Sequence, residues 1–395
     1  IVGPRHPTPS RVGTLSFTGL ENLAKVQYSR DGGQTWSSSA GVVQGTNDLL
    51  VRQVDLAGNM SDATLFSFFL DTAVAAPRVA LVADTGPSAT DRVTSSGALS
   101  VTATESVTLV EYSIDGGVTW TSVFNAVQGA NSVRVRQTDV AGNVSAVTTF
   151  AFTLDSVVPA ALAVALTSDT GASATDGITK TGTLVVTGAE TGAKVEYSTD
   201  GVSWKSSFTA LKGDNSVLVR QTDAAGNVST TTAFAFTLDT VAAIPVVTLA
   251  SDTGRSGTDR ITNAGGLSVT GLETGALVEY STDGGTTWSK SFTPAVGANT
   301  VRIRQTDLAG NVSSAASLTF TLDTSAASPA VKLTRDSGSS TTDRITNVGT
   351  LAVTGLESGA LVEYSTDSGA NWTTTFAATP GLNTILVRQT DVAGN

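Results

Sequence analysis

An 84-residue repeat governs this sequence. The pentapeptide Asp-x-Ala-Gly-Asn occurs five times at a constant interval of 84 residues, and a tryptophan recurs at the same interval. The pentapeptides begin at Asp55, Asp139, Asp223, Asp307 and Asp391, and the tryptophans are Trp36, Trp120, Trp204, Trp288 and Trp372. A unit of this length can enclose a small core of its own, whereas solenoid repeats of about 20–50 residues depend on their neighbours. The sequence therefore predicts a tandem array of small domains, which favours a structural or interaction protein over an enzyme.

The repeat phase divides the chain into five predicted domains. Their bounds are 1–71, 72–155, 156–239, 240–323 and 324–395. We expect the first to be degenerate and to lack its beginning, and the last to lack its final strand. This phase is what a fragment of a longer array would show.

The composition of the chain argues against some classes of binding partner. Acidic residues outnumber basic ones 34 to 23, for a formal net charge of -11. Nucleic acids and anionic membranes attract basic surfaces, so we expect neither as a partner. No run approaches the roughly 18 apolar residues of a membrane span, so membrane insertion is not expected either. The chain has no cysteine, so stability must come from packing, from neighbouring domains or from metal ions.

The clearest copy, residues 240–323, has the pattern of a β-sandwich. Apolar and polar residues alternate over 267–270, 277–281 and 299–306, and turns rich in Gly, Asn and Asp separate these stretches. Alternation with a period of two is typical of strands with one buried face, which places Val301 and Ile303 inward. No stretch has a helical period. The sequence predicts an all-β fold with six or seven strands in each unit.

Recurring carboxylates make calcium the sharpest hypothesis for a ligand. In a sandwich with these strands, the loop after the first strand lies beside the aspartate that ends the same repeat. The next repeat brings a Gly-x-Glu turn and the Asp-x-Ala-Gly-Asn turn to that place. Four or five carboxylates would then converge, as a hard cation with six to eight oxygen ligands requires. The three predicted sets are Asp84, Asp91, Asp155, Glu190 and Asp223; Asp169, Asp176, Asp239, Glu273 and Asp307; and Asp252, Asp259, Asp323, Glu357 and Asp391.

A simpler alternative remains open for each of these residues. An aspartate in a turn often accepts hydrogen bonds from nearby backbone N–H groups and needs no metal. The aspartate before Ala-Gly-Asn fits this alternative best.

Several motifs together resemble a known class of repeat. In order they are the Leu-Asp-Thr link, the SDTG…TDRIT loop, VEYSTDGGTTW and VRQTDxAGNVS. The chain is similar in these motifs to the bacterial Ig-like repeats of large secreted adhesins and biofilm-associated proteins, except over residues 1–10. The resemblance implies a tandem array of Ig-like β-sandwich domains in an extracellular stalk at the bacterial cell surface, with calcium bound between or near the domains.

A second motif, Ser-x-Asp-x-Gly-x-Thr-Trp, occurs at 29–36, 113–120 and 281–288, and 198–204 and 365–372 carry departures from it. It resembles the Asp box of sialidases and other propeller glycosidases. In those families the box is a structural hairpin turn, so the resemblance implies no catalysis. A propeller blade needs only about 40–50 residues, which an 84-residue unit exceeds.

Few combinations of residues in the sequence could support catalysis. The only histidine is His6, so the repeats contain no Ser-His-Asp triad and no histidine metal site. The tryptophans could stack on sugar rings, or they could pack at the end of each sandwich and hold it together. The pairs Arg134/Arg136 and Arg302/Arg304 could bind an anionic surface or pair across strands with Glu111 and Glu279. The Asn-x-Ser sequons at Asn143, Asn227 and Asn311 matter only in a glycosylating host.

These features predict a non-catalytic stalk segment whose partners are calcium ions and neighbouring repeats. Three alternatives stay open. The repeats could assemble with other copies as a filament or surface-layer subunit, they could bind surface glycans, or they could be accessory repeats of a secreted enzyme.

Overall fold

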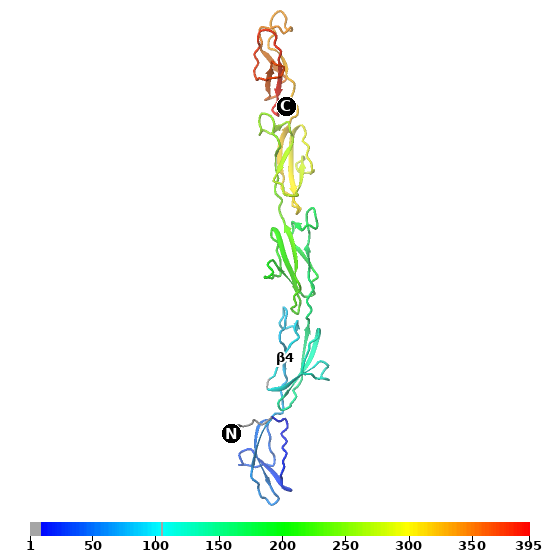
Figure 1. Ribbon diagram of the computed structural model, residues 1–395, viewed down its shortest axis with the longest axis vertical. Helices are drawn as coiled ribbons and strands as arrows, with labels where there is room; N and C mark the ends of the chain where they lie inside the picture. The colour runs from blue at the N-terminus through cyan, green and yellow to red at the C-terminus, as the bar shows by residue number, and fades with distance from the viewer. Residues whose placement is uncertain (1–8, 104–105) are drawn as a thin grey trace. The chain divides into compact units, whose positions relative to one another are not determined.

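The computed structural model describes residues 9–103 and 106–395. Within them the chain forms 25 β-strands and no helix (Figure 1). The chain divides into two compact units, one made of Ile1–Val164, Val186–Phe208 and Leu218–Ala233, the other of Ala165–Val185, Thr209–Val217 and Phe234–Asn395. Residues 156–239, which form one predicted repeat, are shared between the two units. The division therefore does not follow the predicted repeat boundaries, and these boundaries stay predictions.

The first unit begins with a three-stranded antiparallel sheet of order β1-β2-β3. Next come a two-stranded sheet, β4-β6, and a four-stranded sheet of order β5-β9-β8-β7, in which only β5 and β9 are parallel. The strands are β1 (Lys25–Ser29), β2 (Gly45–Val54), β3 (Thr64–Leu70), β4 (Arg78–Leu81), β5 (Val93–Thr94), β6 (Leu99–Thr102), β7 (Val107–Ser113), β8 (Gly129–Asp139) and β9 (Thr148–Leu154).

The pattern recurs further along the chain. Residues 163–238 form the sheets β10-β12 and β11-β15-β14-β13. Their strands are β10 (Ala163–Leu166), β11 (Ile178–Thr179), β12 (Leu184–Thr187), β13 (Lys194–Ser198), β14 (Gly213–Thr222) and β15 (Thr232–Leu238).

The second unit contains the sheets β16-β18 and β17-β21-β20-β19, and then the pairs β22-β23 and β24-β25. The strands are β16 (Val246–Leu249), β17 (Ile261–Thr262), β18 (Leu267–Thr270), β19 (Leu277–Ser281), β20 (Gly297–Thr306), β21 (Ala316–Leu322), β22 (Ala330–Leu333), β23 (Leu351–Thr354), β24 (Leu361–Ser365) and β25 (Leu386–Thr390).

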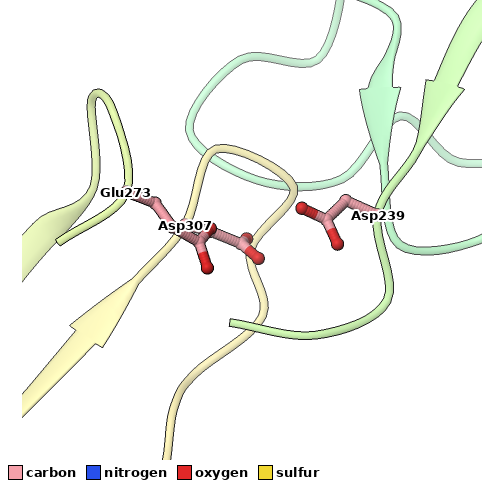
Figure 2. A group of neighbouring side chains, drawn as sticks. All are labelled: Asp239, Glu273 and Asp307. Carbon is pink, nitrogen blue, oxygen red and sulfur yellow. The ribbon is translucent and has the colours of Figure 1, made fainter. Parts of the chain in front are cut away.

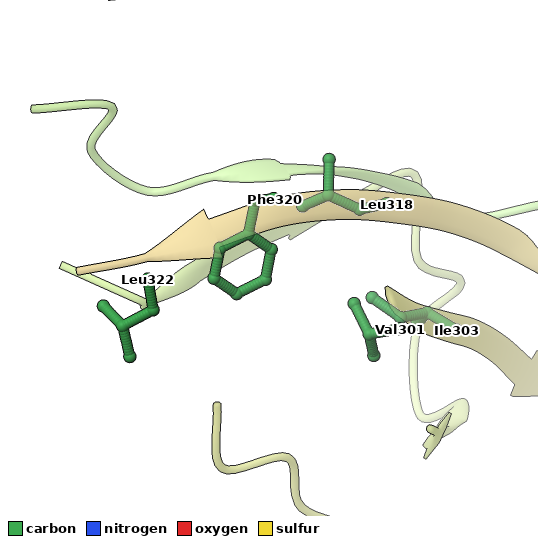
Figure 3. Packing of buried hydrophobic residues seen from close by; sticks show 5 residues of the cluster. All are labelled: Val301, Ile303, Leu318, Phe320 and Leu322. Atoms are coloured by element: carbon green, nitrogen blue, oxygen red, sulfur yellow. The ribbon is translucent and has the colours of Figure 1, made fainter. Parts of the chain in front are cut away.

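The core of residues 240–323 lies between its two sheets. Val301 and Ile303 on β20 are fully buried, and three side chains of β21, Leu318, Phe320 and Leu322, pack beside them (Figure 3). Partly buried residues of β16 and β18 cover this cluster from the other sheet. Each fully buried Val, Ile or Phe contributes about 1.5–3 kcal/mol by leaving water. The predicted all-β tandem sandwich and the inward positions of Val301 and Ile303 are confirmed.

The strand count also agrees with the prediction. Among the described residues, six strands form in each of the ranges 72–155, 156–239 and 240–323. A seventh strand, which would lie in the stretch 288–292, does not form among the described residues; this stretch contributes only an isolated bridge between Tyr280 and Ser289.

The first repeat is less complete than the others. Phe66 on β3 is 49% exposed, whereas Phe150, the matching residue on β9, is 7% exposed. In the second repeat β4 lies against β9. Described residues 9–24 form no strand pair equivalent to β4-β6, which agrees with the greater exposure of Phe66.

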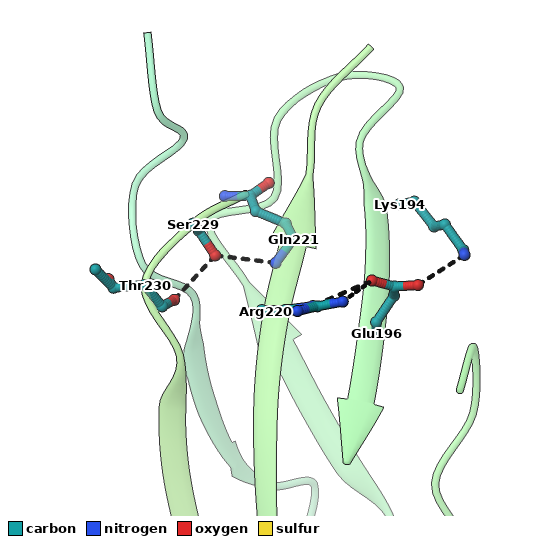
Figure 4. A network of polar contacts seen from close by, with 6 residues as sticks. All are labelled: Lys194, Glu196, Arg220, Gln221, Ser229 and Thr230. Atoms are coloured by element: carbon teal, nitrogen blue, oxygen red, sulfur yellow. Dashed lines mark hydrogen bonds and ion pairs between the residues drawn. The ribbon is translucent and has the colours of Figure 1, made fainter. Parts of the chain in front are cut away.

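One arginine of each predicted pair forms the expected ion pair across its four-stranded sheet. The other, Arg134 or Arg302, donates instead to the backbone carbonyl of Gly116 or Gly284. Arg136 bonds Glu111 at 2.8 Å and Arg304 bonds Glu279 at 2.9 Å. Figure 4 shows the same pair in the third repeat, where Arg220 and Lys194 both contact Glu196. The hydrogen bond from Lys194, together with Arg220, holds the pKa of Glu196 below its usual range although burial opposes this. Such pairs contribute about 0.2–1 kcal/mol each.

Candidate metal site

Consecutive repeats meet at joints, which we name after the aspartate that ends the earlier repeat: the Asp71, Asp155, Asp239 and Asp323 joints. Two of them assemble three carboxylates. Asp239, Glu273 and Asp307 each offer an oxygen, and these oxygens lie within 4.8 Å of one another (Figure 2). At the next joint the three carboxylates are those of Asp323, Glu357 and Asp391, again within 4.8 Å. We call these two groups the joint triads.

The glutamate of the Asp239 triad is held by a ring of hydrogen bonds. Its backbone N–H donates to Oε1 of Gln305 at 2.9 Å, and Nε2 of Gln305 donates to the carbonyl of Ala243 at 2.8 Å. The N–H of Ala243 donates to Oε1 of Glu273 at 2.6 Å. Gln305 is fully buried. It therefore fixes the linker after Asp239 against the turn that carries Glu273.

Gln305 was missed by sequence reasoning, although a signal existed. It follows Val301 and Ile303 at the next inward position of the same strand, where a polar residue needs an internal partner.

Asp307 lies at the end of β20 and caps its own turn. Its Oδ1 accepts the N–H of Asn311 and its Oδ2 accepts the side-chain amide of Asn311, both at 2.8 Å. The simpler alternative for this aspartate is therefore present in the structure. It does not preclude a metal, because each carboxylate oxygen has a second lone pair. Asp307 is 6% exposed and Asp391 2%, so both are buried carboxylates.

The asparagine of the pentapeptide also joins two repeats. Nδ2 of Asn311 donates to the backbone carbonyl of Asp239 at 2.8 Å. The equivalent bonds run from Asn143 to Asp71, from Asn227 to Asp155 and from Asn395 to Asp323, at 2.8–2.9 Å. Since these amide nitrogens are engaged at the joints, the sequons at Asn143, Asn227 and Asn311 are poor glycan acceptors in the folded chain.

The loop after the first strand lies against the next repeat, as the topology argument expects. Oγ1 of Thr170 donates to the carbonyl of Ala309 at 2.6 Å. Gly171 sits so close that a Cβ added there would lie 1.9 Å from the carbonyl oxygen of Leu308. Equivalent contacts join Thr253 and Gly254 to residues 392–393, and Thr85 and Gly86 to residues 224–225. The three joints therefore share a backbone-to-backbone contact.

The loop aspartates do not join the triads. Oδ2 of Asp169 accepts the N–H of Gly177, and Oδ1 of Asp176 accepts the N–H of Ile178, both at 3.0 Å. Asp84 with Asp91 and Asp252 with Asp259 make the same bonds within their own loops. Each predicted five-residue set is thus divided between a loop pair and three other residues. The metal assignment of all fifteen stays a prediction.

The Asp155 joint lacks a triad altogether. Asp155, Glu190 and Asp223 do not gather as the other two sets do, and Glu190 is exposed whereas Glu273 and Glu357 are half-buried. Nε2 of Gln128 donates to Oδ1 of Asp155 at 2.7 Å. The corresponding set at the Asp71 joint includes residue 105, which lies outside the described residues.

The Asp box forms a hairpin turn in which the aspartate accepts several hydrogen bonds. Asp283 accepts hydrogen bonds from Oγ of Ser281 and from the N–H and Oγ1 of Thr287, at 2.6–2.9 Å. The bond from the Thr287 side chain is the largest reason why the pKa of Asp283 lies far below its usual range. In the last copy the N–H and side chain of Asn371 lower the pKa of Asp367 to about 2. With these donors in place, the turn is structural.

An arginine covers the ring of each tryptophan beside this turn. The guanidinium of Arg304 lies 4.1 Å from the ring centre of Trp288, whose Nε1 donates to the carbonyl of Gly285. The other four pairs, at 3.8–4.2 Å, are Arg52 and Trp36, Arg136 and Trp120, Arg220 and Trp204, and Arg388 and Trp372. The guanidinium covers one face of the ring, and this contact supports the structural role of these residues.

Similarity to known proteins is local. A family model described as the BNR/Asp-box repeat matches residues 27–38 and 279–290. Among curated protein sequences, none matches this chain. Fibronectin(III)-like modules of Clostridium thermocellum CbhA align with 14% identity over 39% of this chain and 92% of theirs, with a TM-score of 0.24. Domains 4–9 of the surface layer protein SbsC align with 13% identity over 75% of this chain and 38% of theirs, with a TM-score of 0.16.

No helix among the described residues has the length and apolar character needed to cross a membrane. His6, the only histidine, lies outside the described residues.

Proposed function

We propose that this chain is a non-catalytic extender segment of an extracellular bacterial adhesin, stiffened by calcium at its joints. The tandem β-sandwiches supply length, and each joint sets how far one repeat can swing against the next. Calcium bound at a joint would hold segments of two repeats together and so restrict that swing.

The joint triad is the observation that carries this proposal. Asp239 belongs to one repeat, and Glu273 and Asp307 belong to the next, so a cation held by all three would cross-link the repeats. Three carboxylates within 4.8 Å repel one another unless a cation lies between them. Calcium accepts six to eight oxygen ligands in flexible geometry, so backbone carbonyls and waters could complete its shell.

Removal of one triad aspartate tests the proposal. Asp323→Ala should lower the number of calcium ions bound by the full chain by one in isothermal titration calorimetry. The matched control is Asp155→Ala, which changes the same position at the joint without a triad and should leave the number unchanged. Near-ultraviolet circular dichroism checks that each variant stays folded. An equal stoichiometry in both variants would contradict the ligand assignment.

The alternative function is assembly of this chain with other copies of itself. A filament or surface-layer subunit would grow in mass with protein concentration in multi-angle light scattering. An extender segment would keep the mass of one chain.

A further inference from the structure

The outer face of strand β3 carries two large apolar side chains that solvent reaches. Leu65 is 63% exposed and Phe69 is 37% exposed. Both point away from the core, because they alternate along β3 with Phe68 and Leu70, which are buried. The solvent face of an antiparallel sheet is normally polar, so these two positions break the pattern of the fold.

The matching positions in the other repeats that form this strand are small or polar. They are Thr149 and Thr153 on β9, Ala233 and Thr237 on β15, and Ser317 and Thr321 on β21. Among the exposed large apolar residues of the described chain, the only aromatic ones are Phe66 and Phe69, and both lie on β3. This apolar surface therefore belongs to the first repeat and is not a general property of the array.

The surface continues onto β2 and the Asp-box turn. Leu50 on β2 lies directly opposite Leu65 in the strand register. Cδ1 of Leu50 and the ring of Trp36 both lie within 4 Å of the place where a Cβ on Gly33 would stand. Trp36, Leu50, Leu65 and Phe69 thus follow one another across the outer face of this sheet, and we call them the outer stripe.

The arginine beside the outer stripe has no carboxylate partner. Arg52 stacks on Trp36 at 3.9 Å, as the equivalent arginine does in the other four repeats. In those four repeats a glutamate forms an ion pair with this arginine (Figure 4). In the first repeat Gln27 stands in its place and accepts hydrogen bonds from Nε and Nη2 of Arg52 at 3.0 and 2.9 Å. None of the ion pairs among the described residues includes Arg52, so no side chain there neutralises its charge.

The free donor of Arg52 sets the orientation of a ligand. Its Nη1 has no hydrogen-bond partner within the part of the chain that the structure describes, and a carboxylate would accept a charge-assisted bond from it. Asp48 is exposed on the same face of β2, opposite Ser67. It lies four residues before Arg52, about 13 Å along a strand, so the two do not pair. An acidic group of a ligand is therefore favoured at Arg52 and disfavoured near Asp48.

We propose that the outer stripe docks an extended acidic peptide of a partner protein. A carboxylate of the peptide would bind Arg52, and its apolar side chains would cover Leu65 and Phe69. An extended segment presents alternate side chains to one face, which suits a stripe that runs along a strand. Membranes and nucleic acids call for several cations together, whereas this face offers one unpaired arginine on a chain of net charge -11.

Selection from random linear peptides displayed on phage, with the full chain as the target, tests this proposal. The enriched peptides should place an aspartate or glutamate beside large apolar residues, and synthetic copies should bind in fluorescence anisotropy. Leu65→Thr with Phe69→Thr gives β3 the residues of the second repeat and should abolish binding. Gln27→Glu gives Arg52 the partner that the other repeats have. It should weaken binding roughly 10- to 100-fold, as the loss of a hydrogen bond to a charged group does.

The matched control is Leu56→Ala. Leu56 is 79% exposed in the turn after β2, and Ala224 occupies its place in the third repeat. This variant should bind the peptides as the native chain does. All the substitutions introduce residues that other repeats already carry at the same positions, so each variant should stay folded, which circular dichroism checks.

Two results would overturn the proposal. If no acidic, apolar sequences are enriched, or if they bind the double variant as tightly as the native chain, the outer stripe is not a docking surface. Equal affinity for Gln27→Glu and the native chain would remove Arg52 from the site, and with it the acidic partner. The measurements use no calcium, so neither result bears on the extender proposal.

Discussion

The Asp155 joint and the Asp323 joint are built from nearly the same sequence, yet only the latter assembles a triad. Both have the Thr-Gly loop contact and the asparagine bond across the joint. They differ in the residue that precedes the glycine at the start of the long strand. This residue is Gln128 in the second repeat and Val296 in the fourth.

Gln128 competes for the joint aspartate. Its Nε2 donates to Oδ1 of Asp155, and its Oε1 accepts the N–H and the hydroxyl of Ser156. Val296 is 71% exposed and has no polar group with which to contact Asp323. The Asp239 joint is intermediate, because Nζ of Lys212 lies 3.5 Å from Oδ1 of Asp239 and would be repelled by a bound cation.

The linker differs as well. β10 begins eight residues after Asp155 (163 minus 155), whereas β22 begins seven residues after Asp323 (330 minus 323). The longer linker contains Pro159, and no hydrogen bond from it reaches the carboxylate of Glu190 within the described residues. Glu190 is therefore left in solvent. One side chain and one linker residue thus distinguish the joint without a triad from the joint that gathers three carboxylates.

The largest expected effect comes from breaking the contact that these joints share. Gly254→Ala would place a Cβ 2.0 Å from the carbonyl of Val392, so the loop must leave the next repeat. We expect the Asp323 joint to lose its protection from hydrogen exchange, with a destabilisation of about 1–3 kcal/mol from overpacking. Gly284→Ala is the matched control, because Gly284 has a similar positive φ of 79° but no atom within 4 Å of the added Cβ. Equal protection in the two variants would show that the loop contact does not hold the joint.

A smaller effect should follow when the Asp323 joint is given the side chain of the Asp155 joint. Val296→Gln should capture Asp323 as Gln128 captures Asp155. A net hydrogen bond is worth about 0.5–1.5 kcal/mol, which corresponds to a roughly 2- to 10-fold weaker calcium affinity at this joint. Calorimetry measures the affinity, and Val296→Leu serves as the control for bulk. If Val296→Gln binds calcium as tightly as Val296→Leu does, the side chain at this position does not distinguish the joints.

We expect the smallest effect at the Asp boxes. Their carboxylates accept hydrogen bonds within their own turns, whereas those of the triads are the candidate calcium ligands. Hydrogen bonds from Asn371 and Ser365 lower the pKa of Asp367 from 3.8 to about 2. A group with a depressed folded-state pKa stabilises the fold above its unfolded pKa, and this contribution is lost as pH falls through the folded value. The Tm should therefore fall as the pH is lowered from about 4 to 2. Asp367→Asn should make this fall slightly shallower and should leave calcium binding unchanged. An identical pH profile would mean that the turn does not stabilise the repeat through its charge.

Much of the fold was predictable from the sequence because strand alternation is a local property. The burial of Val301 and Ile303 and the ion pair between Arg304 and Glu279 follow from a period of two and from the turns that set the register. The pairing of the loop with the next repeat's turn followed from strand direction alone.

The division of the carboxylates was not predictable. Whether Asp252 points toward Asp323 or binds the N–H of Arg260 depends on the left-handed φ of 61° at Arg260, a conformation that a sequence pattern does not specify for arginine. The effect of Gln128 depends on a side-chain contact across 27 residues. Equal spacing of the repeats also hid the longer linker at Pro159, because the Asp-box turn of that repeat is one residue shorter.

Small-angle X-ray scattering of the full chain, with calcium and then with excess chelator, tests the central claim most directly. We expect chelation to broaden the distance distribution and shorten the maximum dimension, and added calcium to reverse both changes. The variant Asp239→Ala with Asp323→Ala should respond less than the native chain. Identical profiles with calcium and with chelator would contradict calcium stiffening and would leave a passive β-sandwich spacer.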